Sequence, residues 1–312
     1  MKPETIRTVF MGTPEFALST LKGLIAAGVN MVGVYTQPDR PKGRGKKLAA
    51  SPVKQLALEH EIPVYQPVKL RDPQAVEELR ALKPDLIVVV AFGQILPKAV
   101  LEIPTYHCIN VHASLLPKYR GAAPINKAIL DGETETGVTT MLMDVGLDTG
   151  DMLVKLSLPI GPDETAGQLH DRLALLGCKA MEETLAQLCA GTLTAEKQDD
   201  ELSTYAPMMK KEDGLIDWTC SAQEIHNQVR GLDPWPGAYT MLDGEVLKIA
   251  ATAVEEGAGE PGTILSADKS GVRIACGQGV LVIDELQLPG KKRLKVINFL
   301  SGRPLFVGTR LG

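Results

Sequence analysis

The sequence lacks an apolar run long enough to cross a bilayer. Its longest run, Leu86 to Phe92, is far short of the roughly 18 to 20 residues that a membrane span requires. The chain also lacks a strong charge imbalance, since its formal net charge is −5 with 23% charged and 44% hydrophobic residues. Met1 to Arg7 lead straight into a strand-like segment, without the apolar core of a secretory signal. We therefore expect a cytoplasmic protein without membrane contacts, and the global charge indicates no partner.

Closely spaced cysteine pairs are missing as well. The chain has five cysteines, an odd number, at widely separated positions: Cys108, Cys178, Cys189, Cys220 and Cys276. No short spacing resembles a zinc site, and only one histidine, His112, lies near the acidic residues discussed below. We expect free thiols in a reducing compartment and no metal site.

A dinucleotide fingerprint is absent from the first glycine turn. Gly12-Thr13-Pro14 follows the first expected strand, but the second and third glycines of the phosphate-binding motif are missing. Glu15 places an acid where a pyrophosphate would bind the helix start. We therefore expect no nicotinamide cofactor, and a tight turn at Gly12.

The patterns that are present predict two domains. Residues 1–190 alternate short apolar strands with helices, which is typical of a Rossmann-like α/β domain with a parallel sheet. A long amphipathic helix at 164–190 closes this part, and a polar linker is expected at 191–209. Residues 210–312 show short strands separated by turns such as Asp243-Gly244, which predicts a smaller β-barrel of the OB type.

Polar side chains gather where two strands of the predicted sheet end. Strand alternation places Asn110 and His112 on one side of the strand 108–112, at the edge where open α/β sheets bind ligands. Asp148, in the loop 144–151, could reach His112 from the next strand. An amide, an imidazole and a carboxylate are suited to stabilise an oxyanion and to move a proton. Taken alone, however, a histidine at a strand end can also be structural.

Two motifs resolve this ambiguity. Asn110-x-His112 is followed by Ser114-Leu115-Leu116-Pro117 and Arg120-Gly121, and later by Asp144-x-Gly146-x-Asp148-x-Gly150. In this order, they resemble the formyltransferase family that uses 10-formyltetrahydrofolate. Gly12-Thr13-Pro14, the segment 37–41, Phe92 to Pro97 and the C-terminal part extend the resemblance along essentially the whole chain.

The resemblance implies an activity and a set of site residues. Residues 1–190 would be the catalytic domain, in which Asn110 and protonated His112 stabilise a tetrahedral oxyanion and Asp148 holds His112 and helps to move the proton. The formyl donor would be 10-formyltetrahydrofolate, bound by three segments: Phe92, Gly93, Gln94, Ile95 and Leu96; Asp144, Val145, Gly146 and Leu147; and, flanking them, Ser114, Leu115, Leu116 and Pro117.

The acceptor amine has to be inferred from other segments. Five basic residues, Arg40, Lys42, Arg44, Lys46 and Lys47, crowd a loop with two glycines, and such a loop suits a phosphate backbone. It could also be a solvated surface loop, but in this family the corresponding loop reaches the acceptor end of tRNA. The resemblance then implies formylation of the α-amino group of methionyl initiator tRNA, for translation initiation, by a monomeric enzyme whose C-terminal barrel also binds tRNA.

Two other hypotheses remain open on the sequence. An amino-sugar formyltransferase of the same family would use the same catalytic residues, and a non-catalytic tRNA-binding protein could retain the fold. The basic loop argues against the first and the intact catalytic positions against the second. Trp218 and Trp235 could stack on bases, but we expect both to pack in the core of the C-terminal domain.

Overall fold

The computed structural model describes residues 1–42 and 47–312, which form two compact units. The first unit comprises residues 1–121, 136–158 and 170–205. The second unit comprises residues 122–135, 159–169 and 206–312. The sequence predicts that the first domain ends at residue 190 and that the second begins at residue 210, and these boundaries stay a prediction. Within the described residues, no helix is both long and apolar enough to cross a membrane.

The first unit is built on a seven-stranded sheet with strand order β10-β9-β7-β6-β1-β2-β5. The pairs β1–β2, β2–β5, β1–β6 and β6–β7 are parallel, and β7–β9 is antiparallel, so the sheet is mostly parallel as expected. The strands are β1 (Arg7–Gly12), β2 (Asn30–Tyr35), β5 (Val64–Tyr65), β6 (Leu86–Val90), β7 (Cys108–His112), β9 (Glu135–Leu142) and β10 (Met152–Pro159). Two short strands, β3 (Arg40–Lys42) and β4 (Lys47–Ala49), pair separately.

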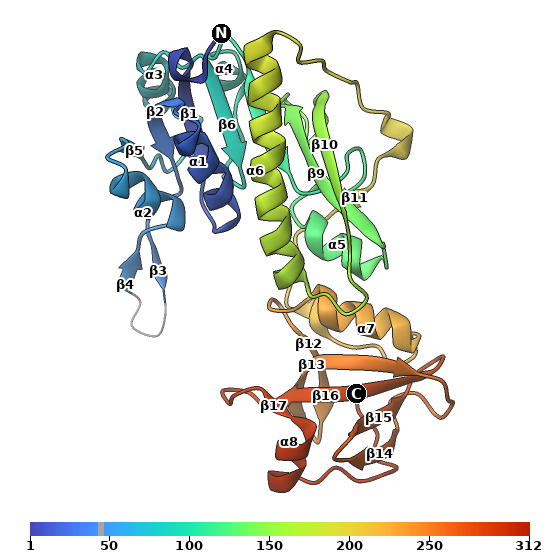
Figure 1. Ribbon diagram of the computed structural model, residues 1–312. Coiled ribbons are helices and arrows are strands. Elements are labelled where there is room, and N and C mark those ends of the chain that lie inside the picture. Colours follow the sequence, from blue (N-terminus) through green and yellow to red (C-terminus); the bar gives the residue numbers. More distant parts are fainter. Residues whose placement is uncertain (43–46) are drawn as a thin grey trace. The chain divides into compact units, whose positions relative to one another are not determined.

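Helices cover both faces of this sheet (Figure 1). They are α1 (Phe16–Ala26), α2 (Pro52–Glu59), α3 (Pro73–Ala81), α4 (Lys98–Leu101) and α6 (Ala166–Ala190), with short 3-10 turns η1 (Pro3–Thr5) and η2 (Asp200–Leu202). Val9, Met11, Ile87 and Val89 share one buried cluster with residues of α3 and α4. Since both faces are covered, all five residues of β6 are buried, which explains its continuous apolar run.

Glycines allow α6 to approach its neighbours closely. A Cβ atom at Gly177 would lie 3.0 Å from Val111 of β7, and one at Gly23 of α1 would lie 2.4 Å from the sulfur of Cys178. The two glycines therefore seat α6 against both the sheet and α1. This packing leaves the other side of β7, which carries Asn110 and His112, free to form the site.

Gly137 of β9 offers a test of this packing. A Cβ atom at Gly137 would lie 2.1 Å from the backbone oxygen of Leu156 in β10, and a paired backbone cannot yield as a flexible side chain can. We expect Gly137→Ala to lower the free energy of unfolding by about 3 kcal/mol, measured by urea titration. Gly302→Ala is the control, because a Cβ atom there meets nothing within 4 Å. Equal stability of the two variants would contradict the packing described.

The second unit contains an antiparallel sheet with strand order β12-β13-β16-β15-β14, and β17 pairs with β16. Its strands are β12 (Ala238–Leu242), β13 (Glu245–Glu255), β14 (Ile264–Asp268), β15 (Gly271–Ala275), β16 (Val280–Gln287) and β17 (Leu294–Lys295). Its helices are α5 (Pro124–Leu130), α7 (Ala222–Gly231) and α8 (Val296–Gly302), with the 3-10 turn η3 (Glu212–Gly214). Short strands β8 (Arg120–Gly121) and β11 (Tyr205–Ala206) pair with each other.

The two tryptophans of this unit differ in their surroundings. Trp218 lies in the core and its indole N–H donates to the hydroxyl of Thr240 at 3.0 Å, as expected for a buried indole. Our expectation for Trp235 is wrong, because that side chain is 54% exposed. Trp235 lies between Pro234 and Pro236, both of which follow cis peptide bonds.

Candidate active site

The polar residues expected at the end of β7 meet the loop after β9. Asn110 pairs with Val89 of β6 on one side and with Met141 of β9 on the other, near the carboxyl ends of both neighbouring strands. It is half-buried, whereas the side chain of His112 is only 6% exposed. Strand alternation places both on the same face of β7, as the sequence indicates.

His112 is held between a backbone carbonyl and a carboxylate. Its Nε2 lies 2.9 Å from the carbonyl oxygen of Tyr119, and its Nδ1 lies 3.6 Å from Oδ2 of Asp148. A carbonyl oxygen can only accept, so Nε2 must carry a proton. The second nitrogen, Nδ1, faces Asp148.

Asp148 is fixed by its own backbone and by a neighbouring amide. Its φ angle of +53° lies in the left-handed region, which aspartate tolerates better than most residues. The backbone N–H of Gly121 donates to Oδ2 at 2.8 Å, and the side chain is 14% exposed. Asp148 therefore presents an oriented carboxylate to His112 in a site largely screened from water.

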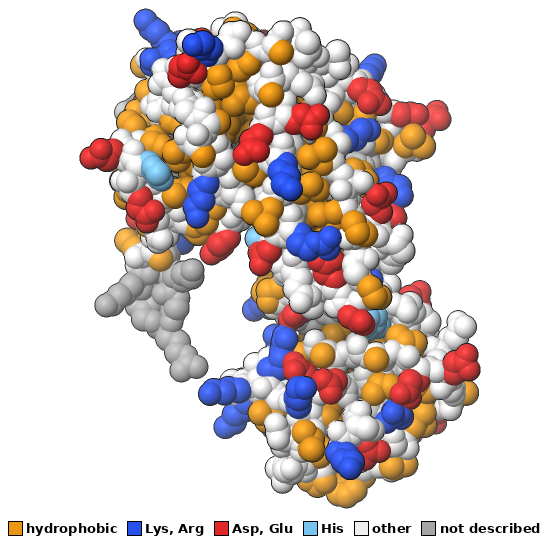
Figure 2. All heavy atoms as spheres, in the orientation of Figure 1, with side chains coloured by type: hydrophobic (Ala, Val, Ile, Leu, Met, Phe, Trp, Pro, Cys, Tyr) orange, Lys and Arg blue, Asp and Glu red, His pale blue; other side chains and the backbone are white. Residues whose placement is uncertain are grey.

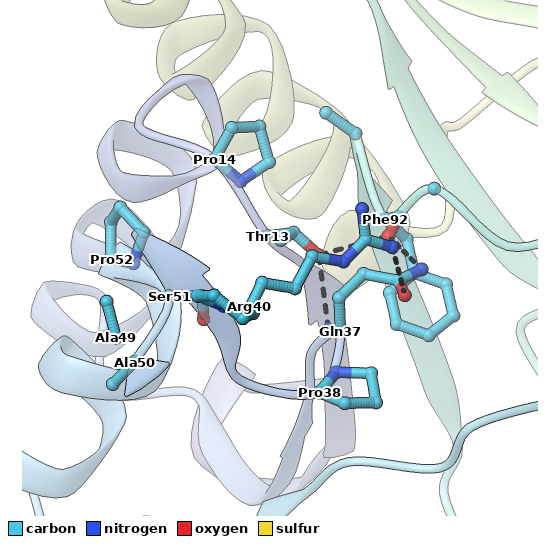
Figure 3. Close-up of a pocket in the computed structure, with 13 residues that line it drawn as sticks. Thr13, Pro14, Gln37, Pro38, Arg40, Ala49, Ala50, Ser51, Pro52 and Phe92 are labelled. Carbon is cyan, nitrogen blue, oxygen red and sulfur yellow. Dashed lines mark hydrogen bonds between the residues drawn. The ribbon is translucent and has the colours of Figure 1, made fainter. Parts of the chain in front are cut away.

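A cavity of about 440 Å³ opens at the same edge of the sheet (Figure 3). It is lined by segments that follow β1, β2 and β6, and by residues of β3 and of the chain leading into α2. The hydroxyl of Thr13 donates to the carbonyl oxygen of Phe92 at 3.0 Å, and the side-chain amide of Gln37 donates to the same oxygen at 3.2 Å. Arg40 lies across the cavity and contacts Gln37 at 3.5 Å (Figure 3).

The first glycine turn forms one wall of this cavity. A Cβ atom at Gly12 would lie 2.9 Å from Cβ of Ala17 and 3.0 Å from the carbonyl oxygen of Val90. The close approach of β1 to α1 and β6 accounts for this glycine, and the tight turn that we expect there stays a prediction.

Two family models cover most of the chain. The model described as "Formyl transferase" matches residues 6–185, and the model "Formyl transferase, C-terminal domain" matches residues 208–304. The chain belongs to the formyl transferase family. Methionyl-tRNA formyltransferases are similar to this formyltransferase over nearly its full length. That of Geobacter sulfurreducens is 61% identical over 98% of this chain and 97% of its own, and that of Alkaliphilus metalliredigens is 56% identical over 98% of both.

Solved structures share the fold of this formyltransferase at low identity. An N-formyltransferase from Helicobacter canadensis, in complex with folinic acid and dTDP-3-aminofucose, is 21% identical with a TM-score of 0.69, over 89% of this chain and 99% of that one. HypX from Aquifex aeolicus, in complex with tetrahydrofolic acid, is 20% identical with a TM-score of 0.62, over 95% of this chain and 47% of that one. These likenesses support the α/β fold with an additional antiparallel β domain.

The residues expected to bind the folate fall into two classes in this formyltransferase. Ile95, Val145 and Leu147 are 89%, 78% and 57% exposed on the loops after β6 and β9. Such exposed apolar side chains are suited to contact a flat ring. Gly93, Gly146, Leu115, Pro117 and Asp144 lie in the same loops or beside them, and Asp144 accepts hydrogen bonds from Gly146 and Thr149.

The other expected folate residues stabilise the loops themselves. Phe92, Leu96, Ser114 and Leu116 are buried, and the Ser114 hydroxyl donates to the carbonyl oxygen of Lys118 at 2.6 Å. Gln94 accepts from the backbone of Leu70 and donates to the carbonyl oxygen of Pro67. These five residues shape the site through packing and hydrogen bonds inside the protein.

The basic residues expected to contact tRNA lie on and between β3 and β4. Arg40 and Lys42 belong to β3 and Lys47 to β4, whereas Arg44 and Lys46 lie outside the described residues. Strands β3 and β4 pair in antiparallel register, which the sequence does not predict. Lys42, the last residue of β3, pairs with Lys47, the first residue of β4.

Cys108 shares the face of β7 with Asn110 but lies deeper. The thiol is buried among apolar residues, and burial raises its pKa to about 12. It therefore stays protonated at neutral pH and is a poor nucleophile. The described residues contain five free cysteines, as expected from their spacing.

Sequence reasoning missed Gln198, which is only 5% exposed. Its side-chain amide donates to the carbonyl oxygens of Asp148 and Gly150, at 2.8 and 2.7 Å. Gln198 lies in the polar segment that we expect to be a linker, about 50 residues from its partners. No periodicity or spacing in the sequence signals this contact.

Proposed function

We propose that the protein transfers the formyl group of 10-formyltetrahydrofolate to the α-amino group of methionyl initiator tRNA. The observation that carries the proposal is the identity of about 60% to methionyl-tRNA formyltransferases over 98% of the chain. The product would be N-formylmethionyl-tRNA, the substrate for translation initiation. The geometry of Asn110, His112 and Asp148 supports the chemistry.

The reaction would begin with attack of the uncharged α-amine on the formyl carbon. A carbon–nitrogen bond forms and the carbonyl becomes an oxyanion in a tetrahedral intermediate. The amide N–H of Asn110 would donate to this oxygen, and the positive charge of protonated His112 would stabilise it, since preorganised polar groups are most effective there. The ring of His112 is oriented by the carbonyl of Tyr119 at Nε2 and by Asp148 at Nδ1.

The intermediate would then collapse with loss of the folate. The bond between the formyl carbon and N10 of the folate breaks, and the proton of the attacking nitrogen has to reach N10. Asp148 would carry this proton, directly or through water, and would hold the imidazolium of His112 in place. Its position 3.6 Å from Nδ1 supports both roles.

The acceptor distinguishes this proposal from its main alternative. The structure in complex with folinic acid and dTDP-3-aminofucose shares the fold at 21% identity, a level that supports only the fold. An amino-sugar acceptor therefore remains the alternative outcome. Purified protein would be incubated with 10-formyltetrahydrofolate and either methionyl initiator tRNA or dTDP-3-aminofucose, and the formylated product would be quantified by mass spectrometry. Lack of formylmethionyl-tRNA would contradict the proposal.

Binding of the tRNA would rest on the basic residues of the segment 40–47. On the face in view in Figure 2, basic and acidic side chains are interspersed, so we expect local basic clusters rather than net charge to attract RNA. We expect replacement of Arg44, Lys46 and Lys47 by alanine to weaken binding. The slope of log affinity against log salt should fall by about 2, since each phosphate contact contributes roughly 0.7 to 0.9.

A variant that loses the same charge elsewhere is the control for this measurement. Lys22, Lys98 and Lys179 are exposed and lie outside the basic segment. Their replacement by alanine should leave the salt slope nearly unchanged in filter-binding or fluorescence titrations. If the two triple variants behave alike, the segment 40–47 has no specific role in binding.

The proposal also includes that the active enzyme is a cytoplasmic monomer. The cytoplasm is where initiator tRNA is charged and used. One chain supplies all three residues, Asn110, His112 and Asp148. Sedimentation of the purified protein should give the mass of one chain, 33.5 kDa.

A further inference from the structure

The segment after α6 runs along the active site. The backbone of Glu196 exchanges two hydrogen bonds of 2.8 Å with Met152 of β10. Eight residues later, the carbonyl oxygen of Thr204 accepts from the backbone N–H of Arg120 at 2.9 Å. We call residues 196–204 the strap. Both of its ends are hydrogen-bonded to other segments of the first unit.

The strap contacts both groups that hold the ring of His112. The hydroxyl of Thr204 accepts from the backbone N–H of Tyr119 at 2.8 Å, and the carbonyl oxygen of Tyr119 accepts from Nε2 of His112. On the other side of the ring, Gln198 donates to the carbonyl oxygen of Asp148. Each partner of His112 is therefore tied to the same short segment.

Gln198 is the most constrained side chain of the strap. Nε of Arg120 donates to Oε1 of Gln198 at 3.0 Å, and because arginine has no acceptor this contact fixes which end of the amide is oxygen. The amide nitrogen then points at the carbonyl oxygens of Asp148 and Gly150. Asp200 pairs with the outer side of the Arg120 guanidinium at 2.7 Å, which orients Arg120 in turn.

The backbone at Asp148 needs such support. Its left-handed conformation costs free energy for a residue other than glycine and persists only where surrounding contacts hold it. The side chain of Gln198 is nearly buried. Without its amide, the carbonyl oxygens of Asp148 and Gly150 would lose their hydrogen-bond donor. A relaxed loop would carry the carboxylate away from Nδ1 of His112.

We propose that Gln198 is a positioning residue for formyl transfer, which holds the loop 148–150 so that Asp148 faces His112. This inference rests on the proposed function, because it assigns Gln198 a role in the same reaction. Gln198 acts on the reacting atoms only through Asp148. Its loss therefore lowers turnover more than it weakens the binding of the two substrates.

The test compares Gln198→Leu in two backgrounds. In the wild-type background, kcat for methionyl-tRNA should fall about 10- to 100-fold, while KM for each substrate stays within about threefold. In an Asp148→Asn background, the same substitution should lower the single-turnover rate by less than about twofold, because the positioned carboxylate is already gone. Equal fold losses in the two backgrounds would overturn the proposal.

Two further measurements keep the test decisive. Gln198→Glu retains the shape and the contact with Arg120 but cannot donate to the two carbonyl oxygens, so it replaces Gln198→Leu in the same cycle if the leucine variant does not fold. A crystal structure of either variant should show Asp148 displaced from His112, and an unmoved Asp148 would refute the proposal. An inactive wild-type protein would instead count against the proposed function.

Gln187→Leu is the matched control. The amide of Gln187 donates to the carboxylate of Glu183 on the surface of α6, at 3.1 Å. The same chemical change there should leave kcat and both KM values unchanged. A comparable loss of kcat in this control would show that leucine at a polar position lowers activity nonspecifically.

Discussion

Replacing His112 by alanine should lower kcat by about 10²- to 10³-fold, which is what one group that stabilises an oxyanion contributes. The substitution removes the ring that lies between the Tyr119 carbonyl and Asp148. The affinity for methionyl-tRNA should change by less than about threefold, because the loss concerns a contact made in the transition state. Single-turnover formylation and equilibrium binding measure the two quantities separately.

His60→Ala is the control for this prediction. His60 is exposed at the end of α2, and its replacement should leave kcat unchanged. A His112→Ala protein that folds and keeps more than about a tenth of the wild-type kcat would show that His112 is structural, since one group that stabilises an oxyanion usually contributes about 10²-fold or more.

The second large effect is expected at Asp148. Asp148→Asn keeps the shape of the side chain, and asparagine tolerates the φ angle of +53° as well as aspartate does. The amide oxygen can still accept from Gly121, so the variant removes the negative charge while the loop is retained. We expect kcat to fall about 10³- to 10⁴-fold, as when a carboxylate that orients a catalytic histidine loses its charge.

A second histidine–aspartate pair provides a matched control for Asp148. Nδ1 of His170 lies 3.0 Å from Asp171, whose side chain is 83% exposed. Asp171→Asn removes the same charge beside the same kind of ring, but in solvent, and should leave kcat unchanged. If Asp148→Asn is as active as Asp171→Asn, the carboxylate has no part in proton transfer.

The two substitutions should also be strongly non-additive. Nδ1 of His112 and Oδ2 of Asp148 lie 3.6 Å apart, and both residues would act on the same tetrahedral intermediate. The double variant should therefore be little slower than the slower of the two single variants. Rates that multiply would indicate two independent contributions and would contradict the joint role.

The elements of the first unit follow closely from local patterns. The strand expected at 108–112 matches β7, and the helix expected at 164–190 matches α6. Ser51 caps α2 just where Pro52 opens the helix. Local patterns succeed here because apolar runs, capping side chains and prolines act over a few residues. The same patterns failed at Trp235, whose exposure depends on how the chain around it folds, and at the short pair β3–β4.

The sequence by itself determined the α/β architecture with its additional β domain, and it brought Asn110 and His112 to one face of one strand. Both follow from the two-residue period of a strand and from the order of elements along the chain. Only the tertiary structure decided which further groups hold His112 and Asp148. The Tyr119 carbonyl and Gln198 come from two separate segments, and hydrogen bonds between separate segments leave no period in a sequence.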